Sequence, residues 1–136
     1  MRSMEIIRID QRPSERGSAD YFAGRVWIDP IAAPAAPSRV RALRVTFEPG
    51  ARTAWHTHPL GQVLHILSGV GCVQRAGEAV QTVKPGDSVV FLPGERHWHG
   101  AAPGHAMVHL AIQEVNEAGS HVTWLEQVTD ADYSAR

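Results

Sequence analysis

The sequence offers little thiol chemistry, because only one of its 136 residues, Cys72, is a cysteine. A single thiol excludes an intrachain disulfide and a zinc site built from several thiolates. An excess of one charge is also missing, since 13 Lys and Arg stand against 14 Asp and Glu, for a net charge of −1 with histidine neutral. A chain so close to neutrality has no overall attraction to nucleic acid, so we expect no nucleic-acid partner.

Long hydrophobic runs are absent as well. The longest, such as residues 89–92, are far too short to cross a bilayer, so we expect no membrane association. The first ten residues, MRSMEIIRID, lack the apolar stretch of a secretory signal. Together with the lone thiol, these features predict a cytoplasmic protein.

Histidine, in contrast, is abundant. The chain has eight, and four of them form two His-x-His pairs, His56 with His58 and His97 with His99. A chain poor in thiols and rich in histidine, if it binds a metal, must use imidazole and oxygen ligands.

The length predicts a single domain over residues 1–136. Turn signals such as Pro49-Gly50, Pro85-Gly86 and Pro93-Gly94 recur along the chain, with short runs of apolar residues between them. This rhythm is typical of an all-β sandwich or barrel. The only helical signal lies at the C-terminus, with Thr129 or Asp130 as the N-cap. We expect strands at residues 21–28, 40–48, 54–58, 62–68, 71–75, 79–84, 87–92, 96–100, 105–114 and 122–124.

The histidine pairs lie in segments expected to be extended. Residues two apart in a strand project to the same face, so His56 and His58 point together. Gln62 opens the next apolar run, and His97 follows a Pro-Gly turn. We therefore predict a metal held by His56, His58 and His97, with Gln62 as an oxygen ligand. All four ligands are neutral, and they suit divalent Mn, Fe, Co, Ni or Zn.

Two further histidines are candidates for a general base. His109 shares a strand face with Met107, Ala111 and Gln113, and if this face lines the barrel, the imidazole lies across from the metal. An ordinary histidine pKa near 6.5 suits proton transfer near neutral pH. His99 is the rival base, and a hydrogen-bonded core or interface histidine is the structural alternative for His109.

Gln113 is a candidate for orienting a substrate, or else it is a polar residue at the open end of its strand. His65 lies on the face opposite Gln62 and should not be a ligand. His105 and His121 are expected to be exposed, and Trp124 is expected to serve packing rather than binding.

The spacing of these residues resembles the two motifs of the cupin superfamily. The segment from Gly50 to Gly69 reads G-x5-H-x-H-x3-Q-x6-G, where the general cupin pattern has Glu instead of Gln. The segment from Gly86 to Ala101 is similar to the second motif, with Leu92 in a proline position and Ala101 in place of the final Asn. The resemblance implies an all-β, jelly-roll β-barrel with a metal inside it.

A narrower resemblance is to the bacterial cupin hydroxynitrile lyases. It rests on three segments, residues 47–62, 93–103 and 109–113. It implies a carbon–carbon lyase that uses manganese(II), held by three His and one Gln. The expected small-molecule substrates are (R)-cyanohydrins such as mandelonitrile, which are cleaved to an aldehyde and hydrogen cyanide. Small cupins usually assemble, so a homodimer or homotetramer is expected.

Two other functions stay open from the residues alone. A three-imidazole site with open positions also suits a dioxygenase that uses Fe or another redox metal. The third alternative is a non-enzymatic cupin that binds a small molecule or a metal. Oxygen uptake and cyanide release distinguish the two enzymatic alternatives.

Overall fold

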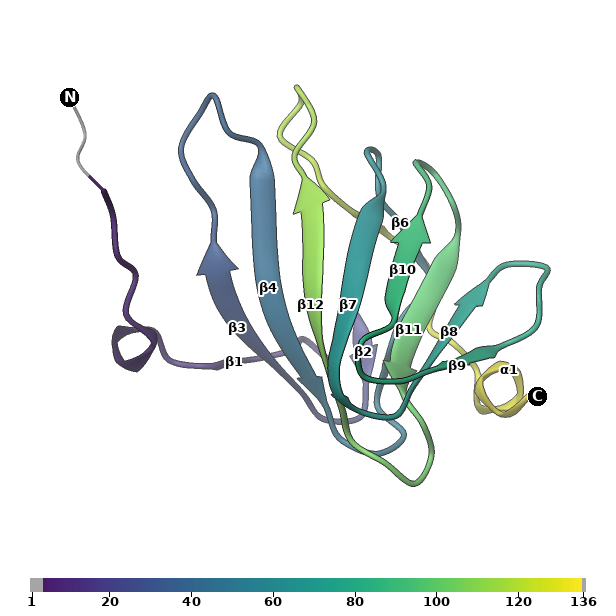
Figure 1. The fold of residues 1–136 in the computed structure, drawn as a ribbon. Helices are drawn as coiled ribbons and strands as arrows, with labels where there is room; N and C mark the ends of the chain where they lie inside the picture. Colours follow the sequence, from purple (N-terminus) through teal and green to yellow (C-terminus); the bar gives the residue numbers. More distant parts are fainter. Residues whose placement is uncertain (1–3, 136) are drawn as a thin grey trace.

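The computed structural model describes residues 4–135, and it arranges them as two facing antiparallel β-sheets (Figure 1). The predicted all-β architecture is confirmed, with a short helix near the C-terminus. The first sheet has six strands in the spatial order β1 (Glu15–Arg16), β3 (Val26–Ala32), β4 (Val40–Phe47), β12 (Met107–Glu114), β7 (Gln62–Gly69) and β10 (Ser88–Phe91).

The second sheet is built from shorter strands, and β11 lies at its centre. Its main path runs β13 (Thr123–Trp124), β6 (His56–Thr57), β11 (His97–Ala101), β5 (Arg52–Thr53) and β2 (Phe22–Ala23). The strand β8 (Gly71–Arg75) also pairs with β11, and β9 (Gln81–Val83) pairs with β8. Both His-x-His pairs begin in this sheet, because His56 lies in β6 and His97 in β11.

The predicted strand over residues 21–28 is wrong as one element, because it divides between the two sheets. Phe22–Ala23 pairs with β5, whereas Val26–Ala32 pairs with β4. Gly24 lies between them with φ +79°, and a Cβ there would come within 2.9 Å of the backbone of Ala51. Only glycine tolerates both the left-handed backbone and this close approach, so the chain turns from one sheet to the other at this point.

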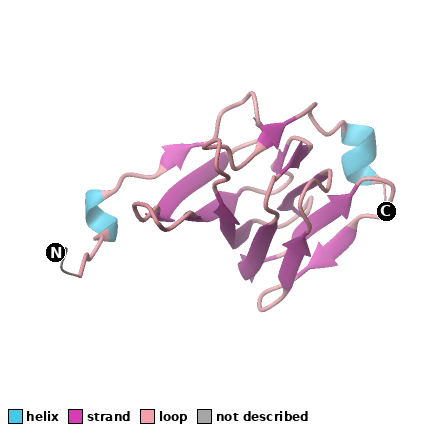
Figure 2. Cartoon of the chain, turned by 90° about the horizontal axis from the view of Figure 1, so that it is seen from above, coloured by secondary structure: helices cyan, strands magenta, loops and turns pink. Residues whose placement is uncertain are grey.

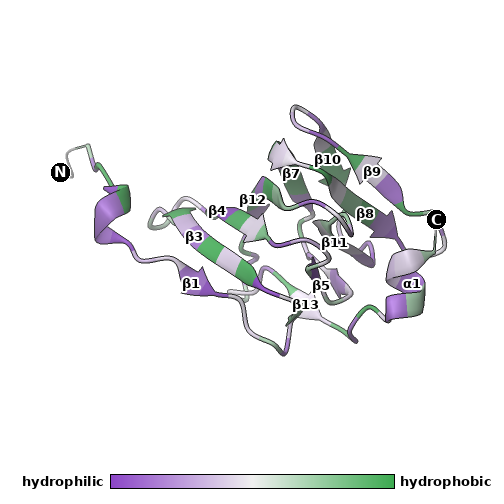
Figure 3. Cartoon of the chain, turned by 90° about the horizontal axis from the view of Figure 1, so that it is seen from below, coloured by the Kyte–Doolittle hydropathy of each residue, from purple (hydrophilic) through white to green (hydrophobic). Residues whose placement is uncertain are grey.

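The space between the sheets holds the main apolar core. Its fully buried members include Phe47, Leu64, Ile66 and Met107, which come from β4, β7 and β12. The alternation expected for these strands is confirmed over most of their core-facing residues, since Val45 and Phe47 on β4, Gln62, Leu64 and Ile66 on β7, and Met107, His109, Ala111 and Gln113 on β12 are buried. On β12, Val108 is buried as well. Figure 3 shows hydrophobic and hydrophilic residues next to one another along β3 and β4. The same alternation turns His109 and Gln113 inward with the core.

The two short helices lie at opposite ends of the molecule (Figure 2). Near the N-terminus the 3-10 helix η1 (Ile9–Gln11) extends away from the sheets, and Met4 and Ile9 are exposed. Among residues 4–135, no helix has the length and apolar character needed to span a membrane.

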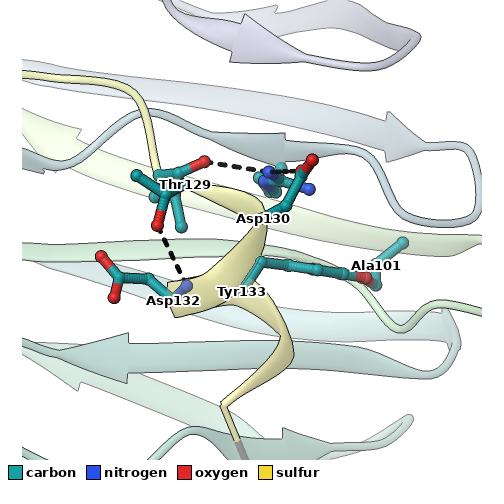
Figure 4. Close-up of polar contacts among 7 residues, drawn as sticks. Ala101, Thr129, Asp130, Asp132 and Tyr133 are labelled. Carbon is teal, nitrogen blue, oxygen red and sulfur yellow. Dashed lines mark hydrogen bonds and ion pairs between the residues drawn. The ribbon is translucent and has the colours of Figure 1, made fainter.

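The C-terminal helix α1 (Asp130–Ser134) begins at the predicted N-cap. The Thr129 side chain accepts a hydrogen bond from the backbone N–H of Asp132, at 3.0 Å (Figure 4). The buried Tyr133 donates its hydroxyl to the carbonyl of Ala101, at 2.5 Å. Since Ala101 ends β11, the helix anchors the strand that carries His97 and His99.

Candidate metal centre and cavity

Seven buried polar side chains from four strands and one loop meet between the sheets: His56, His58, Gln62, His97, His99, His109 and Gln113. The register of the sheets brings them together: His97 is the Cα partner of His56, and Gln113 is the partner of Gln62. His109 lies next to these on β12, where it is fully buried. His58 follows β6 in the loop, and its ring centroid lies 5.0 Å from that of His56 and 5.5 Å from that of His97.

Three of these histidines form a group able to hold a metal ion. One nitrogen from each of His56, His97 and His99 lies within 4.8 Å of the other two, and all three residues are buried. The sequence predicts His58 and Gln62 as ligands alongside His56 and His97, and His99 as a base that rivals His109. The structure places His58 and Gln62 beside the group, and it brings His99 into the group itself. The four-ligand set therefore stays a prediction.

Hydrogen bonds to backbone carbonyls orient the three motif histidines. The Nδ1 atoms of His56, His58 and His97 lie 2.9 Å, 2.6 Å and 2.8 Å from the carbonyl oxygens of Ala54, His121 and Glu95, respectively. In each ring a hydrogen on Nδ1 satisfies that carbonyl and leaves the Nε2 lone pair free. This arrangement is the usual one for metal-bound histidine, because the outer hydrogen bond fixes the tautomer and the ring orientation.

The free nitrogens and the Gln62 amide fit a metal. Nε2 of His58 is buried and has no hydrogen-bond partner among the described residues. The Gln62 Nε2 donates to Oε1 of Gln113 at 3.1 Å, which leaves the Gln62 oxygen 3.4 Å from Nε2 of His97. An unpartnered imidazole nitrogen, and an amide oxygen next to a second imidazole nitrogen, are donors of the kind that a divalent transition metal prefers.

Burial keeps these imidazoles neutral. It is the largest cause that lowers the pKa of His97 to about 4, and it lowers the pKa of His56 and His99 well below 6.5. Neighbouring histidines act in the same direction, since charging one imidazole is opposed by the next. Neutral imidazole is the form that binds a metal, so the site is prepared for an ion near neutral pH.

A pair of hydrogen-bonded histidines lies next to the proposed ligands. Nε2 of His109 lies 3.0 Å from Nδ1 of His99, and both residues are buried, His109 completely. Nε2 of His99 has no partner among the described residues, so it is free toward His56 and His97. Phe47 packs against both rings, with its centroid 5.2 Å from that of His109 and 6.0 Å from that of His99.

A mainly apolar cavity of about 330 Å³ opens beside the histidines. Its polar lining comes from the histidines, Gln62, Gln113, Thr53 and Ser18, and no carboxylate is among its described lining residues. The remaining lining residues are aromatic and aliphatic: Tyr21, Phe22, Ile28, Leu43, Val45, Phe47, Ala111, Val122 and Trp124. A cavity of this size and lining suits a small organic molecule with an aromatic or aliphatic group.

The expectation of an exposed His121 is wrong, whereas Trp124 packs against neighbouring rings as expected. Both residues line the cavity, and His121 is half-buried. His121 also supplies the carbonyl that orients His58. These roles arise because the chain returns over β6 after β12, and no local spacing in the sequence predicts that return.

Comparison with known proteins agrees with this geometry. The family model for the cupin domain matches residues 43–112, which span both histidine motifs. The chain belongs to the cupin domain family. It is also 56% identical to the (R)-mandelonitrile lyase of Granulicella tundricola, over 96% of this chain and 98% of that protein.

Solved cupin structures share the fold. A cupin-like protein from Thermotoga maritima superposes with a TM-score of 0.82 at 36% identity, over 96% of this chain and 95% of that chain. The polyketide cyclase RemF from Streptomyces resistomycificus gives a TM-score of 0.69 at 16% identity, over 96% and 91% of the two chains. The second likeness concerns the fold alone. The predicted cupin jelly-roll is confirmed.

Proposed function

We propose that this cupin is a metal-dependent hydroxynitrile lyase that cleaves (R)-cyanohydrins such as mandelonitrile to an aldehyde and hydrogen cyanide. The observation that carries the proposal is the 56% identity, over nearly the full length of both chains, to an (R)-mandelonitrile lyase. The buried histidine group and the apolar cavity beside it provide what this reaction needs.

We propose manganese(II), held by His56, His58, Gln62 and His97, as the metal. The oxygen of Gln62 and the imidazole nitrogens suit it, although Fe, Co, Ni and Zn accept the same donors. A divalent ion among neutral ligands keeps its full charge and supplies a Lewis acid for the negative charge that develops during cleavage. Because Gln62 is neutral where a carboxylate ligand would carry a charge of −1, the net charge of the site is more positive by one elementary charge.

The histidine pair supplies the base. In the proposed tautomers, His99 donates its Nδ1 hydrogen to Nε2 of His109, which leaves Nε2 of His99 as the acceptor facing the cavity and the metal ligands. Backbone groups of His109 and Leu110 favour the charged form of the His109 ring, although burial is the larger effect and lowers its pKa to about 4. His109 then holds the His99 ring and stabilises it when it gains a proton.

The reaction balances without a further reagent. Nε2 of His99 takes the hydroxyl proton of the cyanohydrin, and the oxygen electrons form the carbonyl double bond. The carbon–carbon bond to the nitrile breaks, and its electron pair leaves with cyanide. The proton on His99 then passes to cyanide, which leaves as hydrogen cyanide. Gln113 lines the same cavity, and we propose that it orients the substrate by hydrogen bonding.

The test is cyanide release from racemic mandelonitrile by protein loaded with Mn(II), with oxygen uptake followed in the same reaction. We expect cyanide and benzaldehyde in equal amounts, consumption of the (R)-enantiomer first, and no oxygen uptake. Oxygen uptake without cyanide would instead support a dioxygenase. Metal binding with neither reaction would support a binding module.

We also propose that the chain assembles as a homodimer or homotetramer. Apolar side chains are exposed on three neighbouring strands of the first sheet: Val63 and Leu67 on β7, Val90 on β10 and Ile112 on β12. A contiguous apolar surface of this kind is typical of a subunit interface. Sedimentation velocity should show a dimer or tetramer, and a monomer at all concentrations would contradict the proposal.

A further inference from the structure

The segment that follows β12, residues 116–124, lies outside both cupin motifs in the sequence but contacts the histidine site in space. It turns at residues 116–120 and returns as β13, which pairs with β6 so that Trp124 is the Cα partner of His56 and Thr123 that of Thr57. Backbone hydrogen bonds extend this pairing, since Leu125 donates to the carbonyl of Trp55 at 2.8 Å. The segment therefore lies directly against the strand that carries the first histidine pair.

Two contacts connect this segment to the two histidines of β6 and its loop. The indole of Trp124 packs on the ring of His56, with centroids 4.7 Å apart. The carbonyl of His121 accepts the Nδ1 hydrogen of His58 at 2.6 Å. His121 and Trp124 both lie outside the two cupin motifs, and each contacts a different histidine of the first pair.

The turn at residues 116–120, with which the segment begins, is held by two hydrogen bonds between Asn116 and Ser120. Oδ1 of Asn116 accepts the backbone N–H of Ser120 at 2.9 Å, and the backbone N–H of Asn116 donates to the Ser120 carbonyl at 2.8 Å. Since His121 follows Ser120 directly, these two hydrogen bonds constrain the position of the His121 carbonyl.

We propose that Trp124 is a positioning residue for metal binding, and that the segment Asn116–Trp124 holds His56 and His58 in the orientation that leaves both Nε2 atoms free for the ion. The proposal rests on the metal site of the proposed function, but not on its substrate. An indole against one face of His56 limits rotation of that ring, and the His121 carbonyl does the same for His58. Outer contacts of this kind typically change metal affinity by about 10- to 100-fold when they are lost.

A second aromatic residue provides the matched control. Tyr21 stacks on Trp124, with centroids 4.7 Å apart and planes inclined by 14°, and it also lines the cavity. No ring contact joins Tyr21 to His56 among the described residues, whereas Trp124 contacts both. Replacing Tyr21 should therefore alter the shape of the cavity without releasing the His56 ring.

The experiment measures Mn(II) binding to metal-free protein in the absence of substrate, by electron paramagnetic resonance of the free ion. We expect Trp124→Leu to weaken binding about 10- to 100-fold. Trp124→Phe, which keeps a ring against His56, and Tyr21→Leu should stay within about threefold of the wild type. In the cyanide-release assay, Tyr21→Leu should change KM more than kcat, since Tyr21 lines the cavity.

Circular dichroism and thermal unfolding establish that each variant is folded. If Trp124→Leu does not fold, Asn116→Ala replaces it, because loss of one side-chain hydrogen bond in the turn should weaken Mn(II) binding about 2- to 10-fold. Wild-type affinity in folded Trp124→Leu, or in Asn116→Ala when it is the substitute, overturns the positioning role. Wild-type protein that binds Mn(II) but releases no cyanide contradicts the proposed function and leaves the positioning test intact.

Discussion

Replacing His109 with leucine tests the proposed histidine pair most specifically, because it removes the partner that orients the base His99. The side chain is fully buried, and leucine approximates its volume while removing Nε2, which lies 3.0 Å from Nδ1 of His99. His99 would then keep its place next to His56 and His97, but with a buried Nδ1 that has lost its partner. Leaving one such group unsatisfied costs about 1–3 kcal/mol of stability.

The effect on catalysis should be larger than the effect on folding. A general base that has lost the partner which orients it and stabilises its charge should become slower by about 10²- to 10⁴-fold in kcat/KM. Metal content should remain at the wild-type level, because His109 is not among the proposed ligands. The assay is cyanide release from mandelonitrile, with manganese measured in the same samples.

His65→Leu is the control. The imidazole of His65 hydrogen-bonds to the Ser88 hydroxyl at 2.9 Å on the outer face of the first sheet, away from the cavity. Its loss should alter neither metal content nor turnover. If His109→Leu retains its metal and releases cyanide within about threefold of the wild-type rate, a 10²-fold base contribution is refuted.

Three further predictions follow from the site and its core. Gln62→Glu should bind Mn(II) more tightly yet release cyanide at least about tenfold more slowly, because a carboxylate removes one positive charge from the centre; an unchanged rate would contradict the role of the neutral ligand. Phe47→Ala, at a fully buried position against His99 and His109, should cost about 3–5 kcal/mol in urea unfolding; a loss below about 1 kcal/mol would contradict its place in the core. In metal-free protein the pKa of both His97 and His109 is lowered from 6.5 to about 4, so the unfolded chain binds more protons between these values. The free energy of unfolding should then fall as the pH drops from 6.5 toward 4, and a flat profile in chemical denaturation over this range would contradict the neutral, buried state of these rings.

Much of the site follows from alternation along strands. The two-residue period places Gln62 with Leu64 and Ile66, and His109 with Met107 and Ala111, and the burial of each confirms it. The turn chemistry at the C-terminus places the helix after Thr129 for an equally local reason, since its hydroxyl caps the N–H of Asp132. Strand alternation and helix capping can be predicted from the sequence because each depends on residues only a few positions apart.

Other features depend on contacts between distant segments. His99 joins His56 and His97 because β6 pairs with β11 across 40 residues of chain, and a motif alone does not show which imidazoles meet. His121 lines the cavity because its segment returns over β6. The break at Gly24 is likewise decided by Ala51, whose backbone approaches too closely for any side chain at that position.

The most direct test of the account is a titration of metal-free protein with Mn(II), in which bound metal and the rate of cyanide release from mandelonitrile are measured on the same sample. The account predicts that the rate rises in proportion to bound metal and reaches its plateau at one ion per chain, and that a chelator abolishes it. A rate that does not depend on bound metal would contradict a metal-dependent lyase. Full occupancy of the site without any cyanide release would contradict the lyase itself.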